Sequence, residues 1–168
     1  LTDLHFQVPP KAKELNHPKR WMGSSNLYLL GRHKKFGLNV QKAAIQAAQE
    51  QSPDLLLITG DITAQALKAE FKTAHAELLP LLEQQPSFVI PGNHDIYTSN
   101  KIPVAMRQLF QPWLPKENPY LFQSNSIGAL YIETCQVDWL SRGKVSPKAL
   151  EEATKLLKNS SCHFTFLC

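Results

Sequence analysis

Two short apolar runs, each followed by a glycine turn, constrain the fold of this chain most strongly. Residues 55–59 precede Gly60, and residues 87–90 precede a Pro-Gly pair. Continuous apolar runs of this length are typical of strands that are buried on both faces, as in parallel sheets. The segment between them, residues 64–84, is helical in composition. The order strand, helix, strand therefore predicts an α/β fold.

The rest of the chain continues this alternation. Pro80 is expected to kink the helix at 64–84 or to split off a last short helix. Ser146 and Pro147 have the residue types of an N-cap and a first helical position. The further elements expected are a strand end at 1–5, helices at 36–51, 102–110 and 146–159, a hairpin from 120–123 and 129–134, and a strand at 164–168.

The chain is predicted to be a single domain over residues 1–168. Its first residues have the pattern of a strand whose beginning is missing, and its last residues form a strand with nothing after it. We therefore expect a partial domain, truncated at both ends, from a longer protein. Its apolar runs are far shorter than the roughly 20 residues that span a bilayer. Three cysteines without a Cys-x-x-Cys pair favour a reducing, cytoplasmic location.

The positive charge is concentrated in one part of the chain. Residues 11–42 contain eight Lys and Arg and one acid, whereas the rest contains ten basic and thirteen acidic residues. Most of this charge lies in a long insertion at about 7–35, where aromatic and aliphatic residues alternate with the basic ones. The insertion is either a cap that binds anionic or lipid-bearing substrates at a membrane surface, or a solvated loop with apolar anchors. Nucleic-acid binding is the less favoured third hypothesis.

Three polar clusters follow the predicted strands, where α/β sheets bind their ligands. They are Asp3-x-His5, Gly60-Asp61 and Gly92-Asn93-His94-Asp95. On a regular strand Asp3 and His5 would point to the same face and could bind one cation. Asp61 has two oxygens that can bridge two metals, and Asn93 offers a neutral oxygen ligand. The alternative for each cluster is structural: helix caps and turns that satisfy their own backbone.

His94 and Asp95 are candidate catalytic residues. The imidazole of His94 can donate to a phosphate oxygen or protonate a leaving group. The Asp95 carboxylate could hold that imidazole in one orientation. None of the serines or cysteines has a convincing triad context, so a protein nucleophile is not predicted.

The three clusters, in this order and at these distances, resemble those of the calcineurin-like metallophosphoesterase family. The resemblance implies a sandwich of two β-sheets flanked by helices, and two divalent metal ions of the Mn, Fe, Zn or Mg type. It assigns the first metal to Asp3 and His5, the bridging position to Asp61, and the second metal to Asn93. His94 would contact the scissile phosphate, and a metal-activated water would attack the phosphorus.

The resemblance also implies a function. It is hydrolysis of a phosphodiester or phosphoanhydride bond, as in bacterial cyclic-nucleotide phosphodiesterases and UDP-2,3-diacylglucosamine pyrophosphatases. The expected substrate is a nucleotide or a lipid-linked nucleotide, held in part by Arg20, Arg32 and Lys34. The family's later histidines are not found in residues 1–168, so we expect this piece alone to be inactive. The alternative is a non-catalytic interaction module that retains the fold.

Overall fold

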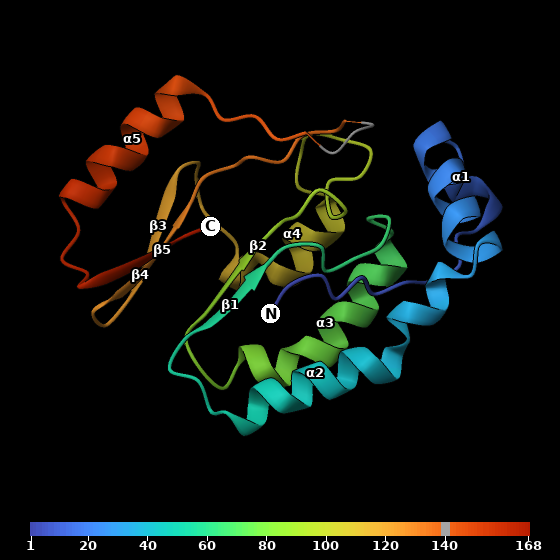
Figure 1. Ribbon diagram of the computed structural model, residues 1–168, viewed down its shortest axis with the longest axis horizontal. Helices are drawn as coiled ribbons and strands as arrows, with labels where there is room; N and C mark the ends of the chain where they lie inside the picture. Colours follow the sequence, from blue (N-terminus) through green and yellow to red (C-terminus); the bar gives the residue numbers. More distant parts are fainter. Residues whose placement is uncertain (139–141) are drawn as a thin grey trace.

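The computed structural model describes residues 1–138 and 142–168 and contains two β-sheets with helices around them (Figure 1). One sheet pairs β1 and β2 in parallel, and the other has the order β3-β4-β5. In the second sheet β3 and β4 are antiparallel, while β4 and β5 are parallel. The strands are β1 (Leu56–Thr59), β2 (Ser87–Ile90), β3 (Tyr120–Ser124), β4 (Ile127–Tyr131) and β5 (Phe164–Leu167). The predicted α/β class and the parallel pairing of the two buried strands are confirmed.

Four of the five helices of the described residues lie close to predicted positions, and the fifth, α1, lies within the predicted insertion, where no helix was expected. The five helices are α1 (Pro18–Ser24), α2 (Leu38–Glu50), α3 (Lys68–Leu82), α4 (Val104–Phe110) and α5 (Pro147–Lys158), with short turns at Ala12–Glu14, Ser25–Leu29, Arg32–Phe36 and Gln111–Trp113. In α5 the hydroxyl of Ser146 accepts a hydrogen bond from the Ala149 amide at 3.1 Å, as predicted for an N-cap. Within the described residues, no helix has the length and apolar character needed to cross a membrane.

Helix α3 begins later than predicted. It continues past Pro80 to Leu82, so the proline does not split off a separate helix. It begins at Lys68 rather than at residue 64, because the buried carboxylate of Glu70 accepts hydrogen bonds from the amides of Gln65 and Leu67. These bonds hold the preceding segment in a non-helical turn in which Ala66 has a φ of 54°. That turn becomes one wall of the functional site.

Two hydrophobic clusters pack against the sheets. Four side chains of α3 (Phe71, Ala74, Leu78 and Leu81) are fully buried and pack with Ile58 and Val89 of the parallel sheet. A second cluster joins the sheets, with Phe88 and Ile90 of β2 against Ala129 and Tyr131 of β4. The ring of Phe88 stacks on that of Phe122 with centroids 5.2 Å apart. The two sheets thus face each other across an apolar layer, as in a sandwich.

The first six residues run beside β1 but do not form the predicted strand. Leu1 accepts a hydrogen bond from the Thr59 amide at 2.9 Å, and Phe6 forms an isolated bridge with Thr63. Between them Asp3 and His5 have φ values of 54° and 47°, in the left-handed region, which interrupts an extended strand. Asp3 and His5 therefore do not lie on a regular strand, and the prediction that strand geometry points both side chains to one face is wrong. Their positions must come from the backbone turns themselves.

Candidate metal centre

The turns after β1 and β2 approach each other so closely that only glycine fits at the contact. Gly60 has a φ of 100°, and a Cβ atom on it would lie 2.7 Å from the Cα of Gly92. A Cβ atom on Gly92 would lie 2.2 Å from the carboxylate oxygen Oδ1 of Asp61. Both distances are shorter than any tolerated contact, so the two glycines are required by this packing. The packing brings the Asp61 carboxylate against the turn that carries Asn93, His94 and Asp95.

Three side chains converge at this point: His5, Asp61 and His94. One potential ligand atom from each lies within 4.8 Å of the others. The Nε2 atom of His5 is 4.0 Å from Oδ2 of Asp61. The backbone amide of His94 donates to Oδ1 of Asp61 at 2.9 Å, and the two imidazole rings are 4.7 Å apart. Two imidazoles and a carboxylate form a donor set that suits Zn, Fe or Mn ions.

The backbone is strained at two of these residues, His5 and Asp61, and at the neighbouring Asp3. Among the described residues other than glycine, six have positive φ angles, and these are three of them. Such conformations are uncommon for residues with a side chain and cost on the order of 1–3 kcal/mol each. Strain of this kind clusters at binding sites, where the surrounding structure maintains it. The coincidence of strain and ligand chemistry supports a functional role for this cluster.

Two further predicted ligands, Asp3 and Asn93, come from the same segments as the cluster. The Oδ1 atom of Asp3 is 3.6 Å from Nε2 of His5, and the Asp3 side chain is 62% exposed. Asn93 is half-buried and lies between Gly92 and His94 in the turn after β2. The roles that the resemblance assigns to these two residues stay predictions.

His5 is suited to bind a metal ion. Burial lowers the pKa of its imidazole, and the nearby His94 lowers this pKa further, while Asp61 and Asp3 oppose the shift. The neutral imidazole is therefore favoured, and this is the form that coordinates metal ions. Its ring also contacts Phe36 edge-on, with the centroids 4.8 Å apart.

The imidazole of His94 is held by a different residue from the one predicted. Its Nδ1 atom lies 2.7 Å from the carbonyl oxygen of Ala64. Because a carbonyl only accepts, Nδ1 carries the proton and donates it, which leaves Nε2 as the second functional nitrogen. The prediction that Asp95 holds the imidazole is corrected: Ala64 does so, from the turn before α3.

Asp95 instead joins the two turns to each other. Its fully buried carboxylate accepts hydrogen bonds from the backbone amides of Gly92, Ile62 and Thr63 at 2.9, 3.2 and 2.8 Å. It also accepts one from the Thr63 hydroxyl at 2.8 Å. Burial raises the pKa of Asp95 to about 6, and these hydrogen bonds oppose the shift. Asp95 thus positions the metal-site turns and does not touch the imidazole through any described hydrogen bond.

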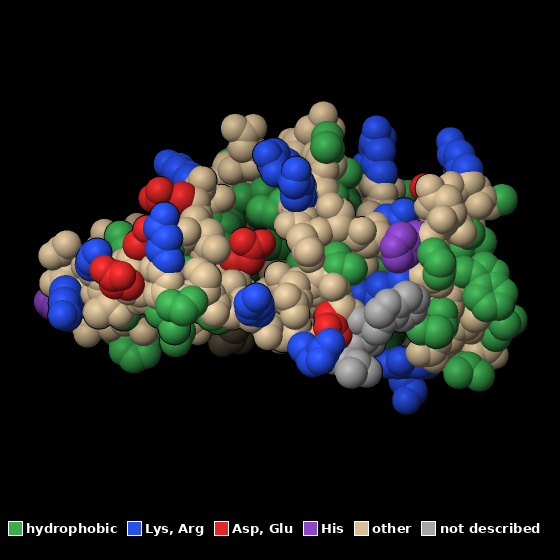
Figure 2. Space-filling model, turned by 90° about the horizontal axis from the view of Figure 1, so that it is seen from above, with side chains coloured by type: hydrophobic (Ala, Val, Ile, Leu, Met, Phe, Trp, Pro, Cys, Tyr) green, Lys and Arg blue, Asp and Glu red, His purple; other side chains and the backbone are tan. Residues whose placement is uncertain are grey.

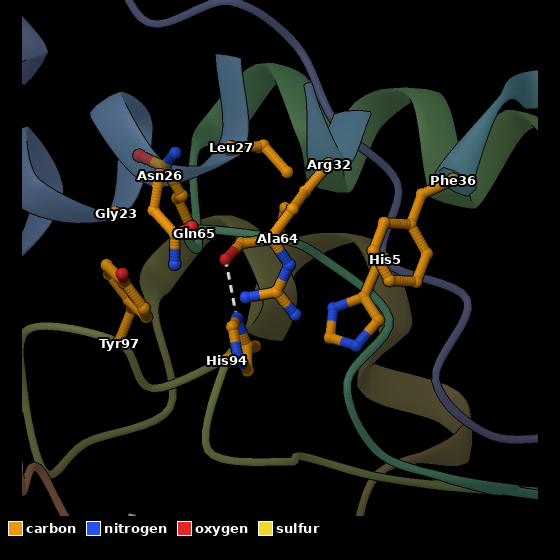
Figure 3. A pocket seen from close by; sticks show the side chains of 10 residues that line it. All are labelled: His5, Gly23, Asn26, Leu27, Arg32, Phe36, Ala64, Gln65, His94 and Tyr97. Atoms are coloured by element: carbon orange, nitrogen blue, oxygen red, sulfur yellow. Dashed lines mark hydrogen bonds between the residues drawn. The ribbon is translucent and has the colours of Figure 1, made fainter. Parts of the chain in front are cut away.

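A pocket of about 130 Å³ opens above His5 and His94 (Figure 3). The basic insertion, which we call the cap and define as residues 7–36, forms much of its wall. The lining residues are His5, Gly23, Asn26, Leu27, Arg32, Phe36, Ala64, Gln65, His94 and Tyr97. In Figure 3 the guanidinium of Arg32 points down between the two imidazoles. The insertion therefore covers the two histidines.

The three predicted substrate-binding residues are not brought together. Arg32 lines the pocket with His5 and His94, whereas Arg20 lines a neighbouring cavity. Lys34 is exposed and is absent from the lining of both. Only Arg32 is thus positioned to contact a group held at the two histidines.

Specific contacts dock the cap onto the domain. The hydroxyl of Ser24 donates to the side-chain oxygen of Gln65 at 2.9 Å. The guanidinium of Arg20 donates to the carbonyl oxygens of Gln65, through Nε, and Ala66, through Nη2, both at 3.4 Å. A Cβ atom on Gly23 would lie 2.1 Å from the hydroxyl of Tyr97, so the cap helix lies directly against that ring. These contacts fix the cap above the site.

Sequence reasoning missed the contribution of Gln65 and Tyr97. Both line the pocket, and Tyr97 lies only two residues after Asp95. The amide of Gln65 and the phenol of Tyr97 belong to no recognisable sequence motif. Only their closeness in sequence to Asp61 and Asp95 could have marked them as site residues. Their position depends on the left-handed turn at Ala66 and on the cap, neither of which has a recognisable local pattern.

Comparison with known proteins agrees with this geometry. The sequence model of the calcineurin-like phosphoesterase family matches residues 1–159, which is nearly the whole chain. No curated protein matches the sequence.

Proposed function

Because this chain belongs to the calcineurin-like phosphoesterase family, a family of metal-dependent hydrolases, we propose that it cleaves a phosphodiester or phosphoanhydride bond of a nucleotide substrate. The convergence of His5, Asp61 and His94 within 4.8 Å carries this proposal. This convergence supports metal binding at the two histidines, above which the pocket under the cap opens. A lipid-linked nucleotide is the more specific form of the same hypothesis.

The proposed centre holds two divalent metal ions. Asp3 and His5 would bind the first, Asp61 would bridge both, and Asn93 would bind the second. Such ions supply positive charge to phosphate oxygens and lower the pKa of a coordinated water. The mixed set of imidazole, carboxylate and amide donors fits ions of the Mn, Fe, Zn or Mg type.

The protein's own groups bind and orient the phosphate. The Arg32 guanidinium, which points between the two imidazoles, can form paired hydrogen bonds with two phosphate oxygens. The hydrogen bond from Nδ1 of His94 to Ala64 leaves Nε2 available to the phosphate or the leaving oxygen. Leu27 and Phe36 provide the apolar part of the wall and exclude water from it.

The rival hypothesis is an interaction module that keeps the fold without catalysis. A module of this kind has no need for strained backbone at Asp3, His5 and Asp61, since strain that serves no site only lowers stability. The geometry therefore favours the enzyme.

Metal removal tests the proposed function. The complete natural protein is expected to hydrolyse bis-p-nitrophenyl phosphate with Mn²⁺, to lose that activity after chelation, and to regain it when Mn²⁺ is restored. Metal analysis should find two equivalents in the active form. Full activity in the presence of excess chelator would contradict the proposal, and so would a protein that binds no metal.

A peripheral contact with a membrane surface, on the cytoplasmic side, extends the proposal. Large apolar side chains of the cap are exposed, among them Trp21 (63%), Leu29 (82%) and Leu30 (75%). Figure 2 shows hydrophobic side chains gathered at the right-hand end of the molecule, where α1 lies in Figure 1, with Lys and Arg nearby. An apolar tip surrounded by basic residues is typical of proteins that bind anionic lipid surfaces.

Vesicle binding tests this extension. The protein is expected to sediment with phosphatidylglycerol vesicles and to sediment less with neutral phosphatidylcholine vesicles, because the cap is basic. Trp21→Ser with Leu30→Ser should abolish the sedimentation. Leu157→Ser, which removes an exposed apolar side chain from α5, is the matched control. Equal sedimentation of all variants, or none by the wild type, would refute the membrane contact.

A further inference from the structure

The peptide group between Ala64 and Gln65 lies between the imidazole of His94 and a buried carboxyl group of α3. This peptide group has two polar atoms, the carbonyl oxygen of Ala64 and the amide nitrogen of Gln65. The carbonyl oxygen lies 2.7 Å from Nδ1 of His94, the contact drawn as a dashed line in Figure 3. The amide donates to Oε2 of Glu70 at 2.9 Å. Glu70 and His94 thus bind the two sides of one peptide group.

The rigidity of this peptide group couples its two partners. The bond is trans, because the one cis bond among the described residues is the bond before Pro119. A trans peptide is planar, and its N–H and C=O groups point in opposite directions. The hydrogen bond from Gln65 to Glu70 therefore sets the direction of the carbonyl group that holds His94.

The neighbouring hydrogen bonds do not fix this peptide group. The amide of Ala64 donates to the carbonyl oxygen of Phe6 at 3.0 Å, but this amide belongs to the preceding peptide group. Arg20 of the cap bonds to the next two carbonyl oxygens, which belong to the two following peptide groups. Within residues 1–138 and 142–168, Glu70 is therefore the partner that holds the N–H side of the Ala64–Gln65 peptide.

Glu70 also has a purely structural use, as a helix cap. It is the third residue of α3, and its Oε2 atom accepts a hydrogen bond from the amide of Leu67, the N-cap residue, at 3.0 Å. A cap needs only this bond, whereas the bond to Gln65 lies outside the helix. The side chain is fully buried, and burial of an acid costs free energy. Capping alone therefore does not account for the position of Glu70.

We propose that Glu70 is a positioning residue for His94, which acts through the Ala64–Gln65 peptide to keep the proton on Nδ1 and to leave Nε2 available in the pocket. This inference rests on the proposed function, in which Nε2 of His94 serves the phosphate or the leaving oxygen. It gives α3 a role in the site that the sequence motifs do not indicate.

Nitrogen-15 NMR of the complete natural protein, labelled at histidine and freed of metal, tests the proposal without depending on activity. At about pH 8.5, where an ordinary imidazole is neutral, His94 is expected to show a protonated Nδ1 and an unprotonated Nε2. The signals that His94→Gln removes identify this ring. Glu70→Met, which keeps a similar length without an acceptor, should shift both signals toward the average of two exchanging tautomers.

Glu70→Gln is the conservative variant and should keep the wild-type signals. Both hydrogen bonds go to one oxygen, and a carboxamide also has one oxygen that can accept them. A neutral group is a fair replacement, because burial raises the pKa of Glu70 to about 7, while the hydrogen bonds from Leu67 and Gln65 oppose this shift.

Turnover of bis-p-nitrophenyl phosphate with Mn²⁺ gives the second readout. Loss of a group that orients an active-site histidine typically costs roughly tenfold to a hundredfold in activity, so Glu70→Met should lower kcat by this factor. Glu70→Gln should keep kcat within about twofold of the wild type. The control is Ser146→Ala, which removes the capping acceptor of α5. It should lower the melting temperature and leave kcat and the His94 signals unchanged.

A folded Glu70→Met protein with wild-type His94 signals would overturn the proposal and leave Glu70 as a helix cap. If that variant does not fold, Glu70→Gln still decides the question. A folded Glu70→Gln protein that has lost the Nδ1 proton, or more than about tenfold in kcat, would also overturn the proposal.

Failure of the proposed function gives a different result. A protein that shows the expected spectra but has no Mn²⁺-dependent hydrolysis of the diester lacks the proposed activity. A protein that hydrolyses the diester, and keeps its kcat and His94 spectrum in the Glu70→Met variant, lacks only the positioning by Glu70.

Discussion

Asp61→Asn is expected to lower kcat/KM for bis-p-nitrophenyl phosphate by roughly a thousand-fold, the effect of losing several kcal/mol of transition-state stabilisation. The substitution keeps the size of the side chain and an oxygen that can accept the hydrogen bond from the His94 amide. It removes the negative charge that would bridge the two metal ions. Hydrolysis by the complete natural protein with saturating Mn²⁺, together with metal analysis, measures both consequences.

The control for this variant lies at the other end of the same strand. Asp54→Asn makes the same chemical change at an exposed residue before β1, far from the turn after the strand. It should leave kcat/KM and metal content unchanged. If Asp61→Asn retains full activity and binds two equivalents of metal, the assignment of Asp61 as a bridging ligand is wrong.

Much of the fold was predictable because its signals are local. Strands β1 and β2 are continuous apolar runs, and helix α5 has a proline at its first position and a serine cap. Residues 1–5 were predicted wrongly as a strand end. Left-handed conformations at Asp3 and His5 depend on hydrogen bonds with the segment after β1, which no local pattern reveals.

The convergence of the metal ligands was predictable for a topological reason. The carboxyl ends of parallel strands meet at one edge of a sheet, so the turns after β1 and β2 had to lie together. The side-chain partners within that edge were not predictable. His94 bonds to Ala64, thirty residues away in sequence, and Asp95 bonds to backbone amides rather than to its neighbour. Because Asp95 follows His94 directly in sequence, it was predicted to bond to the imidazole. Tertiary packing instead gives each residue a different partner.

The substrate-binding residues show the same limit. Composition indicated a basic insertion, and the structure confirms that the cap lines the site through Arg32. Composition could not separate Arg32 from Arg20 and Lys34, because only the folded chain places one of the three in the pocket with His5 and His94.

The second large effect concerns stability. Asp95→Ala is expected to destabilise the protein by about 3–5 kcal/mol, because the backbone donors at Gly92, Ile62 and Thr63 would be buried without partners. Thermal unfolding of the metal-free protein should show a melting temperature lower by roughly 10 °C. Asp54→Ala, which removes an exposed carboxylate, should change the melting temperature little.

This experiment also separates the two roles that Asp95 could have. A residue that only orients the His94 imidazole would lower kcat when replaced and leave the melting temperature unchanged. A residue that joins the turns after β1 and β2 lowers the melting temperature and weakens metal binding together, because Gly92 and Asp61 lose their alignment. Thr63→Val, which removes the hydroxyl that donates to Asp95 and accepts from the Ala66 amide, should reproduce this pattern at about 1–2 kcal/mol. A stable Asp95→Ala protein with normal metal affinity and low kcat would restore the orienting role and contradict the structural one.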